Sequence, residues 1–295
     1  MSFFKKFPTI PYDYNRDGII QNAVSIYKSI RALRSTLDST SIYTFYEVKN
    51  GERPDVVSTR LYGTPEYYWT FFIVNDFLHD GMRAWPMSQE DLDEYMKTEY
   101  DGFAITTRPV IVRDTDQIIT DFRNSLAGRF KVGERIIGVQ PGISTTVSNP
   151  NDPDALSPEQ LQDEQITGCG QLYKKSIDMN QLIIRTCDGT FIGDPDAINN
   201  STQLLIGQTT RDSVSTYQVY NYIDAPYYYY RSDDPEKRPV DNALFIQGGT
   251  PDANLDFVTN RQFLFEQNEE RSKLRVISPA YIDEFVETFK RLINE

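Results

Sequence analysis

The chain has 295 residues, of which 39% are hydrophobic and 13% aromatic, and its formal net charge is -13 at pH 7. This length accommodates two domains, or one domain with a large insertion, and the composition excludes a chain that is disordered throughout. The negative charge argues against a nucleic-acid-binding surface, because phosphate contacts need Lys and Arg concentrated on one face and the basic residues here are scattered.

The N-terminal residues and the apolar runs predict a soluble protein made in a reducing cytoplasm. The first twenty residues do not resemble a signal peptide, because Lys5, Lys6 and Pro8 interrupt their apolar run. No window of the sequence approaches the roughly 18 to 20 apolar residues of a membrane span. We therefore expect no membrane among the partners.

Residues suited to catalysis or metal binding are scarce. The two cysteines, Cys169 and Cys187, exclude a disulfide framework and a four-thiolate zinc site within one chain, and we interpret both as small core residues. The single histidine, His79, lies in a polar turn, and no nucleophile-elbow pattern occurs in the sequence. We interpret His79 as a loop residue and predict no catalytic, cofactor-binding, metal-binding or small-molecule site.

Residues 1–40 are predicted to form an extended arm followed by a helix. The arm is rich in proline and aromatic residues and lacks helical periodicity, so we expect it to order on a partner, and its candidate interface residues are Phe3, Phe4, Phe7, Tyr12 and Tyr14. The helix is predicted from about Ile19 to Leu37, because apolar residues such as Ile20 and Val24 recur there at helical spacing.

Residues 41–104 carry the most specific pattern, which begins with a strand, a turn and a helix. Aromatic and β-branched residues predict a strand at Tyr43–Val48, and Asn50-Gly51 predicts the turn that follows it. Pro54 favours the first position of a helix that ends at Tyr62-Gly63, because glycine readily takes the left-handed conformation that closes a helix.

A second short helix is predicted next, with Thr64 as its N-cap and Pro65 in its first turn. Its inward face is predicted to consist of Tyr68, Trp69, Phe72 and Ile73. A strand, two stacked helices and a closing Asn resemble a LysM module, in the variant found in phage baseplates. The residues that carry this resemblance are Arg53, Pro54, Leu61, Tyr62, Gly63, Tyr68, Trp69, Phe72, Asn75 and Asp76.

The segment after Asp76 departs from an ordinary LysM module, which returns with a second strand that pairs with the first. Here Ser88 and Asp91 form a capping box that predicts a helix at Glu90–Tyr100 instead. The closing strand is therefore expected from elsewhere in the chain. Because LysM modules bind glycans along the edge that this strand normally borders, its absence counts against carbohydrate binding.

Residues 105–215 are predicted to form an inserted β-rich domain. Short β-branched runs separated by Gly, Pro and Asn indicate a small antiparallel barrel or sandwich, and one hairpin is predicted at Leu182–Phe191, turning at Asp188-Gly189. The segment from Gln140 to Gly168 is interpreted as a long exposed loop. Its acidic residues do not match a calcium-binding loop, and they are Asp152, Asp154, Asp163 and Glu164.

Residues 216–295 are predicted to complete the LysM-like core with strands and a final helix. The strands are expected at Tyr217–Tyr230, Val258–Gln267 and Lys273–Ile277, with a turn at residues 268–270 before the last of them. Ser278-Pro279 should open the final helix, whose apolar stripe must be buried on its own sheet or in a partner's groove. Its candidate interface residues are Tyr281, Phe285, Phe289 and Leu292.

The ordered set of Arg53-Pro54, Leu61-Tyr62-Gly63, Tyr68-Trp69 and Asn75-Asp76, followed much later by residues 265–277 and the final helix, resembles a known family. It is similar to the LysM-like baseplate wedge subunit of contractile-tailed, T-even-like bacteriophages. The resemblance implies an α+β fold, in which a LysM-like core of two short helices on a small antiparallel sheet carries the inserted β-rich module and amphipathic helices at both ends. In that family, strands from the C-terminal part close the core.

The same resemblance implies a structural protein without catalysis, located in the tail baseplate of the virion and assembled in the host cytoplasm. It implies that the protein clamps the subunits of its own wedge and touches the neighbouring wedge. Its expected partners are the helical-bundle subunits of the wedge core, proteins on the side of the sheath initiator and the neighbouring wedge, with six copies per baseplate. No nucleic acid, cofactor or small-molecule ligand is implied.

Two other functions stay open from the sequence. One is a LysM-type module of a tail-associated protein that binds glycans such as peptidoglycan. The other is a tail-associated hydrolase, which would have to use His79 or a pair of carboxylates, although no spacing in the sequence selects such a pair.

Overall fold

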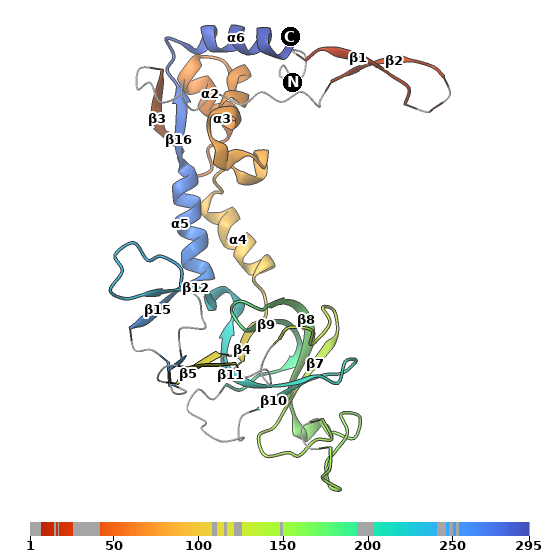
Figure 1. Ribbon diagram of the computed structural model, residues 1–295. Coiled ribbons are helices and arrows are strands. Elements are labelled where there is room, and N and C mark those ends of the chain that lie inside the picture. The colour runs from red at the N-terminus through yellow and green to blue at the C-terminus, as the bar shows by residue number, and fades with distance from the viewer. Residues whose placement is uncertain are drawn as a thin grey trace. The chain divides into compact units, whose positions relative to one another are not determined.

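The computed structural model describes residues 7–14, 16, 18–25, 42–107, 111–114, 117–120, 126–147, 150–193, 203–240, 246–247, 250–251 and 254–294. The chain forms two compact units, shown in Figure 1. The first unit combines residues 1–93 with residues 265–295, and the second unit comprises residues 94–264. The division falls within two helices, α4 (Gln89–Glu99) and α5 (Asn260–Ser272).

The first unit contains the predicted strand, turn and helix. Strand β3 spans Tyr43–Glu47, and helix α2 (Pro54–Tyr62) begins at Pro54 and is closed by Gly63, whose φ is 71°. Thr64 then caps the 3-10 turn η2 (Pro65–Tyr67) by accepting a hydrogen bond from the backbone N–H of Glu66, and α3 (Trp69–Val74) follows. The predicted second helix is thus a 3-10 turn followed by a short α-helix.

The closing strand comes from the C-terminal part, as the resemblance implied. Strand β16 (Lys273–Ile277) pairs antiparallel with β3 over five residue pairs, from Lys273 opposite Glu47 to Ile277 opposite Tyr43. Of the described strands after residue 215, β16 alone pairs with β3.

Two hydrophobic clusters fill the first unit, one on each side of α3. Trp69 and Val74 pack with residues of the final helix α6 (Ile282–Asn294), whereas Phe71 packs with Trp85, Leu274 and Val276. The predicted inward face omitted Phe71, which is buried, while Phe72 and Ile73 are half-buried. The error arose because β16 and α6 cover opposite sides of this short helix.

The residues after α3 form the 3-10 turns η3 (Asp76–Leu78) and η4 (Gly81–Ala84) before α4 begins at Gln89. Ser88 caps the helix as predicted, but the reciprocal bond of a capping box, from the Ser88 backbone N–H to the Asp91 carboxylate, is replaced by one from the Ser88 hydroxyl. The Ser88 hydroxyl donates to an Asp91 carboxylate oxygen over 2.7 Å, and the Asp91 backbone N–H donates to the Ser88 oxygen over 3.1 Å.

The predicted start of the N-terminal helix was wrong. Strand β1 (Thr9–Tyr12) pairs antiparallel with β2 (Gln21–Val24), so these residues form a hairpin in place of the start of the predicted helix at Ile19–Leu37. The turn explains the difference, because Gly18 has a φ of 80° and its N–H donates to the Asp13 carboxylate over 2.8 Å. The rest of the predicted helix, after Ser25, lies outside the described residues, as do Phe3 and Phe4.

Two C-terminal predictions were also wrong. Strand β15 is short (Leu255–Thr259), and residues 260–267, expected to continue a strand, begin helix α5. Thr259 and Gln262 form a reciprocal capping box there, with N···O distances of 3.1 Å in both directions. The final helix begins at Ile282 and not at Ser278-Pro279. The Tyr281 N–H closes a turn on the Ser278 carbonyl, and the helical bonding starts where the Phe285 N–H donates to the Tyr281 carbonyl, while the Ser278 N–H extends the β3–β16 ladder by donating to the Ile42 carbonyl.

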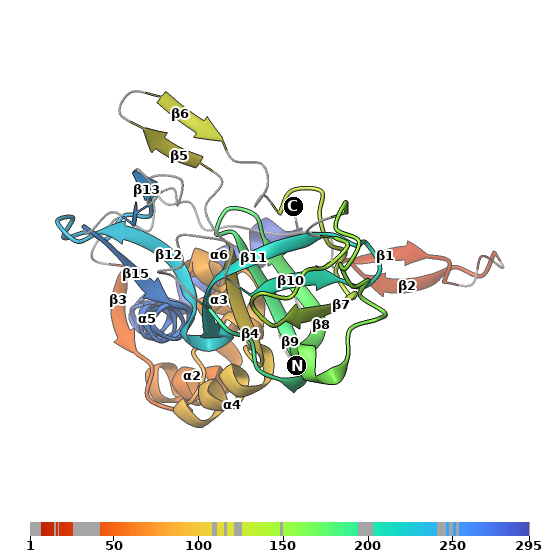
Figure 2. The same ribbon diagram turned by 90° about the horizontal axis from the view of Figure 1, so that it is seen from below.

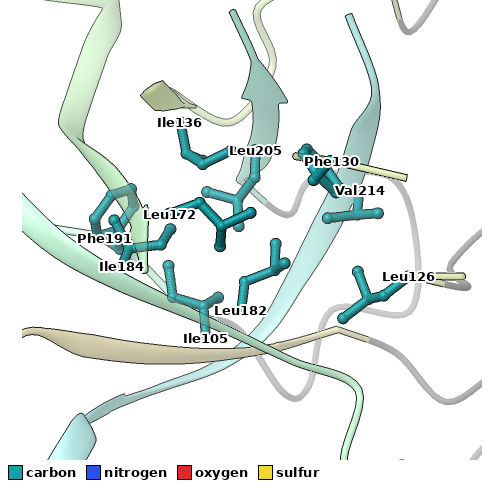
Figure 3. Packing of buried hydrophobic residues seen from close by; sticks show 10 residues of the cluster. All are labelled: Ile105, Leu126, Phe130, Ile136, Leu172, Leu182, Ile184, Phe191, Leu205 and Val214. Atoms are coloured by element: carbon teal, nitrogen blue, oxygen red, sulfur yellow. The ribbon is translucent and has the colours of Figure 1, made fainter. Parts of the chain in front are cut away.

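The second unit is built around a closed six-stranded antiparallel barrel, which confirms the predicted β-rich module. The strand order is β10-β11-β4-β9-β8-β7, and β10 pairs with β7 to close it. The strands are β4 (Phe103–Thr107), β7 (Arg135–Val139), β8 (Ile166–Ser176), β9 (Gln181–Gly189), β10 (Leu204–Gly207) and β11 (Ser213–Asn221). Figure 3 shows the buried aliphatic and aromatic side chains that fill its interior.

The predicted hairpin at Leu182–Phe191 is not present. Strand β9 runs through Asp188 to Gly189, and the turn lies between β8 and β9, where Asn180 has a φ of 46° and its N–H donates to the Ile177 carbonyl. Gly189, with a φ of 78°, lies directly against the backbone of Thr167. A close backbone approach therefore explains this glycine, not a turn.

Two smaller sheets complete the second unit. Strand β12 (Pro226–Arg231) pairs with β15, and the 3-10 turn η7 (Tyr222–Asp224) separates β12 from β11, so the predicted strand Tyr217–Tyr230 is two strands. The other sheet contains β5 (Ile111–Asp114), β6 (Gln117–Thr120), β13 (Ile246–Gln247) and β14 (Thr250–Pro251). Strands β5 and β6 lie side by side in Figure 2. The long loop predicted at Gln140–Gly168 ends in the 3-10 turn η6 (Asp163–Gln165), which is followed by β8.

Candidate protein-interaction surface

The most deeply placed residues of the LysM-like motif hold β16 against the helices. Asn75 is buried, and its amide nitrogen donates to the carbonyls of Phe71 and Arg275 over 2.8 and 2.9 Å. Its side-chain oxygen accepts the Arg275 N–H over 2.9 Å. The Tyr62 hydroxyl donates to the Ile277 carbonyl over 2.9 Å, and burial raises the pKa of Tyr62 well above its usual range. The side chains of Asn75 and Tyr62 therefore stabilise the fold of the first unit.

Trp69 connects α3 to α6. Its ring stacks with Phe285 at a centroid distance of 6.4 Å and packs against Phe289 at 4.5 Å. The Tyr67 hydroxyl donates to the Asp283 carboxylate over 3.0 Å, and this hydrogen bond raises the pKa of Tyr67. The final helix is thus fixed to the helical layer by aromatic packing and one polar contact.

A buried carboxylate organises the turn between β3 and α2. Glu52 accepts hydrogen bonds from the Tyr46 hydroxyl and the Lys49 N–H, over 2.8 and 3.1 Å, and pairs with the Arg60 guanidinium at 2.5 Å. The Trp85 indole N–H donates to the Glu52 carbonyl over 2.8 Å. The sequence analysis missed Glu52 and Trp85, although Trp85 precedes a proline in an otherwise polar turn.

Pro54 is buried at the start of α2, and the other motif residues lie nearer the surface. Arg53 is exposed and pairs with Asp55 at 3.4 Å, while Leu61, Tyr68 and Phe72 are partly buried at the edges of the clusters. Asp76 is exposed at the start of η3.

The candidate interface residues of the N-terminal arm lie in different environments. Phe7 is half-buried and packs with the cluster of α6. Tyr12 and Tyr14 are exposed, and their rings meet edge to face at a centroid distance of 5.1 Å. The described part of the arm therefore presents two adjacent tyrosines to solvent.

The candidate interface residues of α6 divide into two groups. Phe289 is buried, together with Ile282, Val286 and Ile293, and forms part of the core. Tyr281, Phe285 and Leu292 form a second apolar row, which we call the outer stripe of α6. Tyr281 is 40% exposed, Leu292 is 46% exposed and Phe285 is half-buried.

Within the described part of the chain, no three His, Cys, Asp or Glu side chains gather in a group that could hold a metal ion. His79 is exposed, with its Nδ1 atom 3.2 Å from the Asp76 carbonyl and its Nε2 atom 3.3 Å from an Asp80 carboxylate oxygen. In the acidic loop, Asp152 accepts hydrogen bonds from the Ser144 hydroxyl and the Asp154 N–H, which lower the pKa of Asp152. Its carboxylate thus serves the local turn.

The described helices include none with the length and apolarity to cross a membrane. Residues 1–111 of the 295 match the family model described as base plate wedge protein 53. The matched range contains the whole of the motif from Arg53 to Asp76. No curated protein matches the chain.

Proposed function

We propose that the chain clamps wedge subunits together and contacts the neighbouring wedge, because residues 1–111 match the family model described as base plate wedge protein 53. The family match supports a structural role in the tail baseplate of the virion, in contact with other baseplate proteins. In the proposed arrangement, six copies per baseplate bind the helical-bundle subunits of the wedge core and proteins on the side of the sheath initiator. Assembly takes place in the host cytoplasm, and no catalysis is involved.

The outer stripe of α6 is the observation that supports clamping. Ile293 is fully buried whereas the adjacent Leu292 is 46% exposed, so one helix presents apolar side chains to its own core and to solvent. Aromatic and aliphatic side chains at such positions are typical centres of protein interfaces. Tyr12 and Tyr14 provide a second exposed aromatic site in the same unit.

We expect Leu292→Asp to weaken uptake of the protein into a wedge assembled from the other wedge subunits of the same phage. A carboxylate in an apolar contact should reduce binding about tenfold or more, because a buried unpaired charge is strongly unfavourable. The thermal unfolding midpoint should stay unchanged, since Leu292 lies outside the core. Sedimentation of the mixed proteins measures the uptake.

Asn294→Asp is the matched control, because it adds the same charge two residues away at an exposed position of α6. Equal uptake of both variants and the wild-type protein would remove the outer stripe from the proposal. The proposed role as a whole fails if the wild-type protein does not join the wedge and is missing from purified virions.

Glycan binding remains the alternative, and no contact among the described residues of the first unit favours it. The residues after α3 fold back onto the β3–α2 turn, where the Trp85 ring packs between Phe71 and Phe72 at centroid distances of 6.1 and 5.9 Å. Titration with peptidoglycan fragments tests this alternative, and saturable binding would support it.

A further inference from the structure

The sheet formed by β3 and β16 has two outer edges, and the hydrogen-bond pattern identifies which backbone groups face each edge. The Val48 N–H donates to the Ser272 carbonyl and the Ser278 N–H donates to the Ile42 carbonyl. Hydrogen-bonded pairs alternate along an antiparallel ladder, so Thr44 and Tyr46 also bond to β16. The N–H and C=O groups of the odd-numbered residues of β3 therefore point away from β16, and these residues are Tyr43, Phe45 and Glu47.

The far edge of β16 is closed by side chains. Asn75 takes both the N–H and the C=O of Arg275, and Tyr62 donates to the C=O of Ile277. Helix α3 lies beside this edge, with β16 between it and β3 (Figure 1). Two motif residues thus replace a third strand on this side of the sheet.

The outer edge of β3 has no such closure. Among the described residues, none hydrogen-bonds to the outward N–H and C=O groups of Tyr43, Phe45 and Glu47. The Phe45 side chain is 70% exposed, and the five residues of β3 pair with β16 without a bulge or proline. Proteins usually protect such an edge by a bulge, a proline or a covering segment, because it readily pairs with another strand.

We propose that the outer edge of β3 binds an extended acidic segment of another wedge protein as a third strand. The backbone groups of Tyr43, Phe45 and Glu47 provide the ladder, and Phe45 packs against an apolar side chain of the added strand. Lys49, which follows β3, and Arg275 of β16 are exposed near the edge, whereas Lys273 is paired with Glu269 at 3.1 Å. With Glu47 as the charged residue of β3 itself, the remaining charge near the edge is positive, which favours an acidic segment and disfavours a second copy that would bring Lys49 and Arg275 to the same contact.

The inference rests on the proposed function, since it names the kind of contact through which this subunit would join the wedge. Hydrogen exchange tests it directly on the wild-type protein. The probe is a wedge assembled from the remaining subunits of the same phage, without this chain. The amides of Phe45 and Glu47 should exchange at least about tenfold more slowly in the complex, whereas those of Thr44 and Tyr46 are already protected in the free protein. Unchanged exchange at Phe45 and Glu47 in a formed complex would overturn the proposal.

A pair of variants separates the backbone from the side chain. Phe45→Pro removes an outward N–H while leaving the bonds to β16 intact, and Phe45→Val removes the same ring but keeps the N–H. We expect uptake of Phe45→Pro to be about tenfold weaker than that of Phe45→Val, with similar unfolding midpoints. Equal uptake of the two folded variants contradicts strand addition and leaves the proposed role standing.

The remaining outcomes are also decisive. Should Phe45→Pro not fold, the exchange experiment on the wild-type protein decides alone. A dimer of the isolated protein whose formation protects Phe45 and Glu47 would assign the edge to a second copy and overturn the choice of partner. If the wild-type protein does not join the wedge, that result contradicts the proposed function itself. Unequal uptake of the two variants excludes this result, because a difference can be measured only if the protein is taken up.

Discussion

Asn75 makes three hydrogen bonds with two backbone segments that are 200 residues apart in the sequence. We expect Asn75→Ala to lower the free energy of unfolding by about 2 to 4 kcal/mol, because it leaves the N–H and C=O of Arg275 without these partners in a buried site. Urea denaturation followed by tryptophan fluorescence measures the change. Asn294→Ala, at an exposed position of α6, should change stability by less than about 0.5 kcal/mol. Equal effects of the two substitutions would show that Asn75 is not a structural link.

At the scale of single elements, the pairing of the first residues of β8 with the last residues of β9 depends on a close approach of their backbones. A Cβ atom at Gly189 would collide with the Thr167 carbonyl oxygen and the Gly168 backbone, whereas a Cβ at Gly142 meets nothing within 4 Å. Both glycines have positive φ, 78° and 87°. Gly142→Ala should therefore cost only the backbone strain, about 1 to 2 kcal/mol, and Gly189→Ala should cost roughly 2 kcal/mol more.

Thermal unfolding of the two glycine variants, followed by circular dichroism, provides this comparison. The shared positive φ makes Gly142→Ala a control for strain, so the difference between the variants reports the collision alone. Equal unfolding midpoints would mean that the backbones of β8 and β9 can move apart at Gly189 without a loss of stability.

At the scale of the whole molecule, the core of the first unit is assembled from both ends of the chain. Both tryptophans of the protein, Trp69 and Trp85, are buried in this unit, and they pack with residues of α6 or β16. Removing Lys273–Glu295 should therefore expose both indoles and shift their fluorescence emission to longer wavelength. The barrel strands, which lie between residues 103 and 221, should keep their circular dichroism signal.

The matched control for this truncation removes only residues 294–295, because Asn294 is exposed and β16 and the buried residues of α6 remain. Its emission should equal that of the intact protein. Buried tryptophans in the longer truncation would show that the N-terminal part of the first unit folds without β16 and α6.

The resemblance to a baseplate wedge subunit and the mixed α+β fold were both available from the sequence. So were the bounds of several elements, among them Pro54–Tyr62 and Lys273–Ile277. The determinants of these bounds are local, since Pro54 favours a first turn and Gly63 a left-handed C-cap within a few residues of the helix they delimit. The N-cap at Ser88 was readable for the same reason. The capping box formed by Thr259 and Gln262 was not predicted, because the apolar residues around it were interpreted as a strand.

The tertiary structure decided which of these elements meet and which of their faces are buried. The short α3 has a core on both sides, so no single periodic stripe could assign Phe71 to the interior. The pairing of β3 with β16 joins residues more than two hundred positions apart, and nothing in either strand specifies the other. Sequence alone thus determined the bounds of elements that local caps and turns delimit, such as α2, because these signals act over a few residues, but it did not give the bounds of β15, α5 or α6. The closed edge of β16 and the open edge of β3 emerged only from contacts between distant segments.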